Sequence, residues 1–264
     1  MNKEDIETME EWIVTYFDKM VWPKITNLDR MIDQGFIEEA LTLSLCYIEA
    51  IAIFNPSFKS PKYNRSKETF INTIYAYSDF KASFSKISRI FLYRTGRHLC
   101  DKNAKVGKRI CRCKEINAAL LEEYRRDNDH HKEMDKDGVI QYLKTKLSSC
   151  DWGSLETNLD SYSYAAVLYA RGRSSAVHEM GFETVLDKGE PVFERNKQGD
   201  DIYYSGDILC FSKEIILSTL KNVHRNLRSK CLAEAKWPGE LIDGNGSQQI
   251  TASNRNSDTL HCSR

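Results

Sequence analysis

The chain has 264 residues and a mass of 30.5 kDa, which suits one large domain or two small ones. Apolar residues make up 41% of the chain and charged residues 29%, which excludes collagen-like and wholly disordered proteins. Lys plus Arg and Asp plus Glu both number 38, so the zero net charge excludes polyanion binding over the whole surface but permits a local basic patch.

The sequence also indicates a compartment. No run of 18 apolar residues is present, so we expect no transmembrane helix and no membrane partner. The N-terminus begins Met-Asn-Lys-Glu-Asp and lacks the apolar stretch of a signal peptide. The eight cysteines are then interpreted as reduced thiols. We therefore expect a cytoplasmic protein.

The N-terminal third has helical patterning. Apolar residues at steps of three and four predict a helix over residues 4–20. Pro23 ends or restarts that helix, and a second one covers 24–33 until Gly35. Residues 36–54 are apolar nearly all round, which is typical of a central helix covered on several sides.

Glu49 is the lone acidic residue on the apolar part of this central helix. A buried carboxylate requires a partner, and an arginine is the obvious one. The sequence favours a structural ion pair over a catalytic role for this residue.

Four further helices are expected in the middle of the chain, over 67–77, 80–93, 115–126 and 139–147. Residues 127–138 are very polar and are interpreted as an exposed loop.

The C-terminal part begins with a helix-like pattern over 155–180. Residues 191–195 and 201–205 flank a polar turn and predict a small β-hairpin. A last helix is expected over 211–236, with its apolar residues on one stripe.

The fold class is therefore mainly α, with a minor hairpin near residues 191–205. We expect a single helical domain over residues 1–237, with a basic insert at 94–114. Residues 238–264 are rich in Gly, Ser, Asn, Thr and Gln and predict a disordered tail.

The sharpest candidate for chemistry is the pair Arg173 and His178. In an α-helix, residues five apart point about 140° away from each other. Gly172, a local bulge or a two-fold partner would be needed to bring the two together. The alternative is a surface arginine and a histidine that interacts with the carbonyls at the end of a helix.

This pair has a clear chemical use. Histidine exchanges a proton near neutral pH, and arginine holds a phosphate and stabilises the charge that develops on it. These two groups suffice to cleave RNA without a metal or cofactor, because the ribose 2′-hydroxyl is the nucleophile. Both side chains are expected to be replaceable without loss of the fold.

The stretch LYARGRSSAVHEM resembles the active-site helix of the HEPN superfamily (higher eukaryote and prokaryote nucleotide-binding). The family motif is Arg, four to six residues, then His, often with Leu-Tyr upstream and Glu after the His. Leu168-Tyr169, Arg173, His178 and Glu179 stand at those places, while Ser174 replaces the commoner Asn, Asp or His. Segments within 36–54 and over 84–97 resemble the family's first core helix and the segment that precedes its variable insert.

The resemblance implies a helical bundle of the HEPN type that forms a homodimer with two motifs in one cleft. It implies a metal-independent endoribonuclease with a role as a toxin or in anti-phage defence, with an antitoxin or defence partner. Arg173 would hold the scissile phosphate and His178 would transfer the proton, with Ser174 and Glu179 in support. The alternative is a non-catalytic protein that dimerises and binds RNA or a nucleotide.

Residues 86–114 hold ten Lys or Arg against one acid, a net charge of +9. The segment is interpreted either as a track for an RNA backbone or as a solvated loop whose charge balances acids elsewhere. The candidate RNA-binding residues are Arg94, Arg97, Lys105, Lys108, Arg109 and Arg112. The last helix adds a milder basic set: Lys221, Arg225, Arg228 and Lys230.

Four residues of this segment have side chains that can bind zinc, namely His98, Cys100, Cys111 and Cys113. Paired zinc cysteines usually have two residues between them, whereas Cys111 and Cys113 have one. Free thiols in a basic loop are the favoured interpretation, so no metal site is expected.

Overall fold

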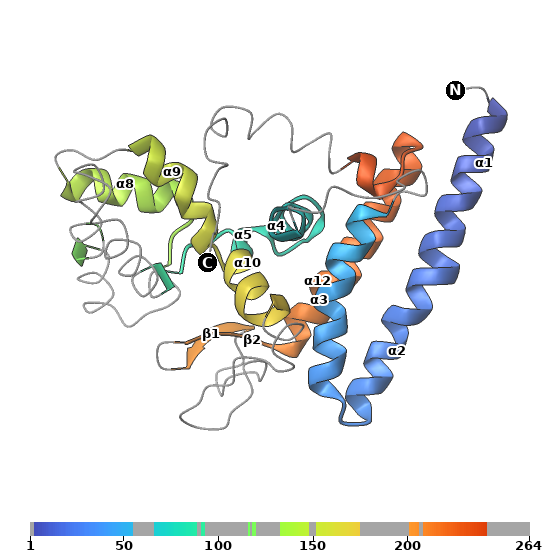
Figure 1. Cartoon of the computed structure of the whole chain (residues 1–264), viewed down its shortest axis with the longest axis horizontal. Coiled ribbons are helices and arrows are strands. Elements are labelled where there is room, and N and C mark those ends of the chain that lie inside the picture. The colour runs from blue at the N-terminus through green and yellow to red at the C-terminus, as the bar shows by residue number, and fades with distance from the viewer. Residues whose placement is uncertain are drawn as a thin grey trace, which may run out of the picture.

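The computed structural model describes residues 3–54, 66–88, 91–92, 116, 118–119, 133–147, 152–174, 201–205 and 208–241. These residues form a mainly helical fold with a small antiparallel sheet, as predicted (Figure 1). The helices are α1 (Lys3–Val14), η1 (Thr15–Val21), α2 (Trp22–Asp33), α3 (Ile37–Ile53), α4 (Ser66–Tyr77), α5 (Lys81–Phe84), α8 (Lys136–Lys146), α9 (Trp152–Leu159), η3 (Asp160–Tyr162), α10 (Tyr164–Val167), η4 (Leu168–Ser174) and α12 (Lys213–Glu234).

The first three helices form one long rod beside α3 (Figure 1). The chain does not leave the helix at Pro23, because the π-helix η1 leads directly into α2, which starts at Trp22. Pro23 lies in the first turn of α2, where a missing backbone N–H removes little hydrogen bonding. Gly35 has a φ of +89° and ends the rod as expected, since glycine adopts this left-handed conformation without strain.

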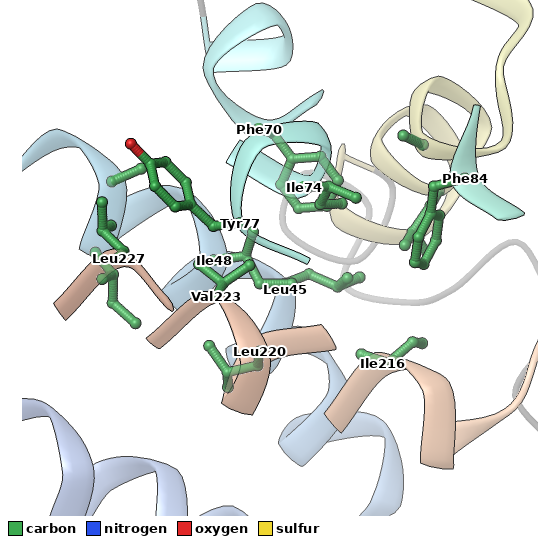
Figure 2. Packing of buried hydrophobic residues seen from close by; sticks show 14 of the residues in the cluster. Leu45, Ile48, Phe70, Ile74, Tyr77, Phe84, Ile216, Leu220, Val223 and Leu227 are labelled. Atoms are coloured by element: carbon green, nitrogen blue, oxygen red, sulfur yellow. The ribbon is translucent and has the colours of Figure 1, made fainter. Parts of the chain in front are cut away.

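The central position of α3 is confirmed. This helix packs against α2, α4, η4 and α12. Its residues Ile48 and Ile51 are 0% and 2% exposed. Figure 2 shows Leu45 and Ile48 of α3 lying among apolar side chains of α4 and α12. The all-round apolarity of the segment therefore reflects burial on several faces.

The described sheet contains a strand pairing that the sequence did not predict. Strand β1 (Ile202–Ser205) pairs antiparallel with β2 (Ile208–Phe211), while the expected partner, 191–195, lies outside the described residues. Phe211 ends a strand and does not begin the last helix. The helix starts two residues later, because the hydroxyl of Ser212 accepts a hydrogen bond from the Ile215 N–H at 3.1 Å and caps it.

The prediction of one helix over 80–93 is wrong. Helix α5 stops at Phe84, and the next residues pair their backbone with distant segments. Ile87 N–H donates to Met134 O at 2.9 Å, and Ser88 N–H donates to Tyr162 O at 2.9 Å. These tertiary hydrogen bonds replace helical ones. They join the main core to a second buried cluster of Ile87, Leu92, Ile116, Val139, Ile140, Leu143, Leu159 and Tyr162.

The prediction of an exposed loop over 127–138 is wrong at the C-terminal end of this segment. Glu133 is 5% exposed, and its carboxylate accepts hydrogen bonds from the hydroxyls of Tyr164 and Tyr204. Ser88 contacts the Tyr204 hydroxyl at 2.8 Å. Burial and the charge of Glu133 raise the pKa of both tyrosines, so they stay protonated and donate. The cluster ties β1 to α10, which leads directly into η4.

The predicted tail begins too early. Residues 238–241 form a helical turn. Leu241 is 5% exposed in the main core, and Gly239 N–H donates to Phe54 O at 3.3 Å. These contacts fix the turn against the end of α3. Residues 242–264 lie outside the described part of the chain.

The basic set on α12 does not form a free cationic surface. Two of its members reach acids on other helices, since Lys221 pairs with Asp29 and Arg228 with Asp18, while Arg225 pairs with Asp79 in the turn after α4. Lys230 pairs with Glu234 of its own helix. These ion pairs therefore stabilise the packing of α12 against the rod and against the turn after α4.

His224 provides a pH-dependent contact between α12 and the rod. Its Nε2 lies 3.1 Å from Phe17 O in η1, and the residue is 5% exposed. Burial lowers the pKa of His224, so the neutral ring donates to the carbonyl. The unfolded chain therefore binds this proton more readily than the folded chain does.

We expect the free energy of unfolding to be highest above about pH 6.5, the ordinary histidine pKa, and to fall as the pH drops below it. Urea unfolding at pH 7.5 and 5.5 measures this loss in the wild type and in His224→Gln, whose amide can still donate to Phe17 O. The wild type should lose more stability than the variant. Equal losses would show that His224 is not responsible.

Candidate functional site

Arg173 lies in a π-helical segment, η4, and not in a regular α-helix. The single helix expected over 155–180 is divided at Ser163, whose extended backbone and hydroxyl cap α10 through the Ala166 N–H at 3.2 Å. A π-helix joins residues five apart by hydrogen bonds. The α-helical angle that separates Arg173 from His178 therefore does not apply to the segment that carries Arg173.

Gly172 lets η4 approach the central helix closely. A Cβ atom placed on this glycine would lie 3.0 Å from Leu45 Cδ1 and 3.2 Å from Leu168 Cδ1. Both leucines are buried in the main core. The absence of a side chain at position 172 thus sets the distance between the backbone of η4 and α3.

This close approach places Arg173 against Glu49. Arg173 Nε lies 3.1 Å from Glu49 Oε2, and the two side chains are 20% and 8% exposed. The distance is that of an ion pair, although neither atom has a hydrogen-bond partner of good geometry among the described residues. The expected arginine partner of Glu49 is therefore confirmed, and it is the arginine of the candidate catalytic pair.

Aromatic rings line this part of η4. The guanidinium carbon of Arg173 lies 5.6 Å from the centre of the Tyr169 ring, within cation–π distance. Tyr169 in turn contacts the buried ring of Phe70 on α4, with centroids 5.4 Å apart. Arg171 lies in the same way over Phe91, at 5.2 Å.

Cys46 belongs to the same neighbourhood, one turn before Glu49 on α3. Burial raises the pKa of the Cys46 thiol, the nearby charge of Arg173 opposes the shift, and Glu49 adds to it. A thiol with a raised pKa is mostly protonated near neutral pH and is a poor nucleophile. We assign no chemistry to Cys46.

Only one of the predicted site residues has a described side chain. Arg173 is placed as given above, and Ser174 is described as part of η4 but without its side chain. The other predicted residues lie outside the described part of the chain: His178, Glu179, Arg94, Arg97, Lys105, Lys108, Arg109 and Arg112. The zinc alternative at His98, Cys100, Cys111 and Cys113 lies there as well.

The described residues contain no group of three His, Cys, Asp or Glu side chains arranged to hold a metal ion. None of the helices described is both long and apolar enough to cross a membrane.

The sequence did not identify the link between Glu49 and Arg173 or the aromatic support beneath the guanidinium. The sequence nevertheless contains an indication at each residue of this ion pair. Glu49 is an acid on a helix expected to be buried, so it needs a cation, and Arg173 follows the apolar-aromatic run 164–169. Periodicity assigns each residue to a face of its helix but does not say which helices meet.

Gly172→Ala tests the close approach. Overpacking against two buried leucines costs about 1–3 kcal/mol, which exceeds the gain of about 1 kcal/mol from better helix propensity. We therefore expect the variant to be less stable to urea. In a Leu45→Ala background the new methyl group partly fills a cavity, so the same substitution should become neutral or stabilising. Destabilisation of equal size in both backgrounds would contradict the contact.

The chain matches no protein-family model, no curated protein and no solved structure.

Proposed function

We propose that the chain is a metal-independent endoribonuclease of the HEPN type, with Arg173 and His178 as its catalytic pair. The observation that carries the proposal is the placement of Arg173. Its side chain is one-fifth exposed, its guanidinium lies within cation–π distance of Tyr169, and it belongs to a π-helical segment packed on the central helix. π-Helical turns occur often at functional sites, and a supported arginine is suited to hold a phosphate.

The proposed reaction uses the substrate's own nucleophile. The ribose 2′-hydroxyl attacks the adjacent phosphorus, the new O2′–P bond forms, and the bond from phosphorus to the 5′-oxygen breaks. His178 transfers protons between these oxygens, and Arg173 stabilises the charge that develops on the phosphate. The products carry a 2′,3′-cyclic phosphate and a 5′-hydroxyl. We further propose that two copies form the cleft, in a toxin or anti-phage defence role.

The ion pair with Glu49 favours a second candidate function. An arginine neutralised by a buried carboxylate also fits a protein that binds RNA or a nucleotide without cleaving it, with the pair holding two helices together. In that case RNA binding would persist without any cleavage.

The two functions are separated by incubating the purified full chain with total RNA and a chelator, followed by end-group analysis. The endonuclease proposal predicts new 2′,3′-cyclic phosphate and 5′-hydroxyl ends. Cleavage that the chelator abolishes, or ends that carry 5′-phosphates, would contradict it. Bound RNA that stays intact would favour the non-catalytic alternative.

A further inference from the structure

Glu49 lies in a buried, apolar environment, where a charged side chain is stable only beside a group of opposite charge. Its side chain is 8% exposed in the apolar middle of α3, between the buried residues Ile48 and Ile51. Burying a carboxylate is costly unless a cation lies close by. The cation it contacts is Arg173, from a segment more than a hundred residues away in the sequence.

Three independent constraints act on the Arg173 side chain. Gly172 brings its backbone against α3, the Tyr169 ring lies within cation–π distance of the guanidinium carbon, and Glu49 contacts its Nε. Nε is the guanidinium nitrogen nearest the aliphatic stem. The contact with Glu49 is therefore distinct from the outer edge formed by the two Nη groups, an edge that can bind a phosphate in a bidentate way.

We propose that Glu49 is a positioning residue for RNA cleavage, which orients the outer edge of Arg173 toward the scissile phosphate. This role rests on the proposed ribonuclease function. The carboxylate also cancels the charge of the guanidinium, so the pair holds a phosphate by directed hydrogen bonds and not by net positive charge. Correct orientation matters most in the transition state, where small displacements of a catalytic group slow the reaction strongly.

The proposal predicts opposite effects on binding and on rate. Glu49→Gln keeps the shape of the side chain but removes its negative charge. A polyanion should then bind as tightly as before or more tightly, whereas an unrestrained Arg173 should slow cleavage about tenfold or more. Loss of a merely structural ion pair would lower the fraction of folded protein without changing the rate of the molecules that remain folded.

The experiment measures two quantities on the full chain. Single-turnover cleavage gives the rate per folded molecule, and the Kd is measured for the same RNA with one 2′-deoxy nucleotide at the scissile position. Glu49→Asp keeps the charge on a shorter side chain and should recover part of the rate. Asp29→Asn is the matched control, because it removes a carboxylate that pairs with Lys221 at 2.9 Å and not with Arg173. It should leave both quantities unchanged.

A measurement without catalysis separates this inference from the ribonuclease proposal. The Nε–H signal of Arg173 in a 15N spectrum, assigned by its loss in Arg173→Lys, should move in Glu49→Gln and not in Asp29→Asn. If the wild type does not cleave RNA, the proposed function fails, while a shifted signal still shows that Glu49 holds Arg173. An unmoved signal, or wild-type cleavage in Glu49→Gln, overturns the positioning role. If Glu49→Gln fails to fold, Glu49→Asp answers both questions.

Discussion

Arg173→Ala is expected to lower the rate of RNA cleavage about a hundredfold or more, since it removes the group proposed to stabilise the phosphate. The structure adds a second effect that the sequence did not predict. Removing Arg173 leaves Glu49 buried and unpaired, which should cost about 3 kcal/mol of stability. We therefore expect the variant to fold, but with lower stability than the wild type. Urea unfolding and single-turnover cleavage measure the two effects.

Arg173→Lys separates stability from catalysis. The lysine ammonium can still pair with Glu49, so much of the stability should return. Cleavage should recover little, because an ammonium lacks the planar fork that holds a phosphate. Arg228→Ala is the matched control: this arginine also pairs with an acid, Asp18, and its removal should leave cleavage unchanged. Wild-type cleavage in folded Arg173→Lys would contradict the assigned role.

His178→Ala is expected to slow cleavage roughly 10²–10⁴-fold, because it removes the proposed proton-transfer group. Its effect on stability should stay within about 1 kcal/mol. The pH–rate profile gives a second measurement, since the wild type should show a pH-dependent step that the variant lacks. Single-turnover rates measured between pH 5 and 8 give both the loss of rate and the pH–rate profile.

The two substitutions should not act independently. If Arg173 and His178 work as one unit, the double variant should cleave no more slowly than the poorer single variant. Cleavage at the wild-type rate in His178→Ala would remove this residue from the site. A double variant that multiplies the two losses would show separate roles.

The sequence predicted the elements whose signal is strong and local. The segment 36–54 contains the central helix, Ile37–Ile53, because its apolar side chains cover the whole circumference. It also predicted that Glu49 would pair with an arginine, because the physical cost of a buried charge is independent of the fold. Identifying the arginine requires knowing which helices are in contact, and no residue pattern contains this information.

The failures have physical reasons as well. The spacing of Phe80, Phe84 and Ile87 suits a helix, but backbone bonds from 87 and 88 to Met134 and Tyr162 end it, and these partners are distant in sequence. Glu133 was assigned to a loop because its neighbours are polar. Two tyrosine hydroxyls, one of them from β1, make its burial favourable.

The most direct test compares the cleavage of two versions of one defined RNA in the presence of a chelator. One version contains only ribonucleotides, and the other has a single 2′-deoxy nucleotide at the cleaved position. The wild type should cleave the first and leave the second intact at that position, because the 2′-hydroxyl is the proposed nucleophile. Arg173→Lys and His178→Ala should cleave neither at a comparable rate. Equal cleavage of both RNAs by the wild type, or cleavage of neither, would contradict the claim that this chain is a metal-independent endoribonuclease.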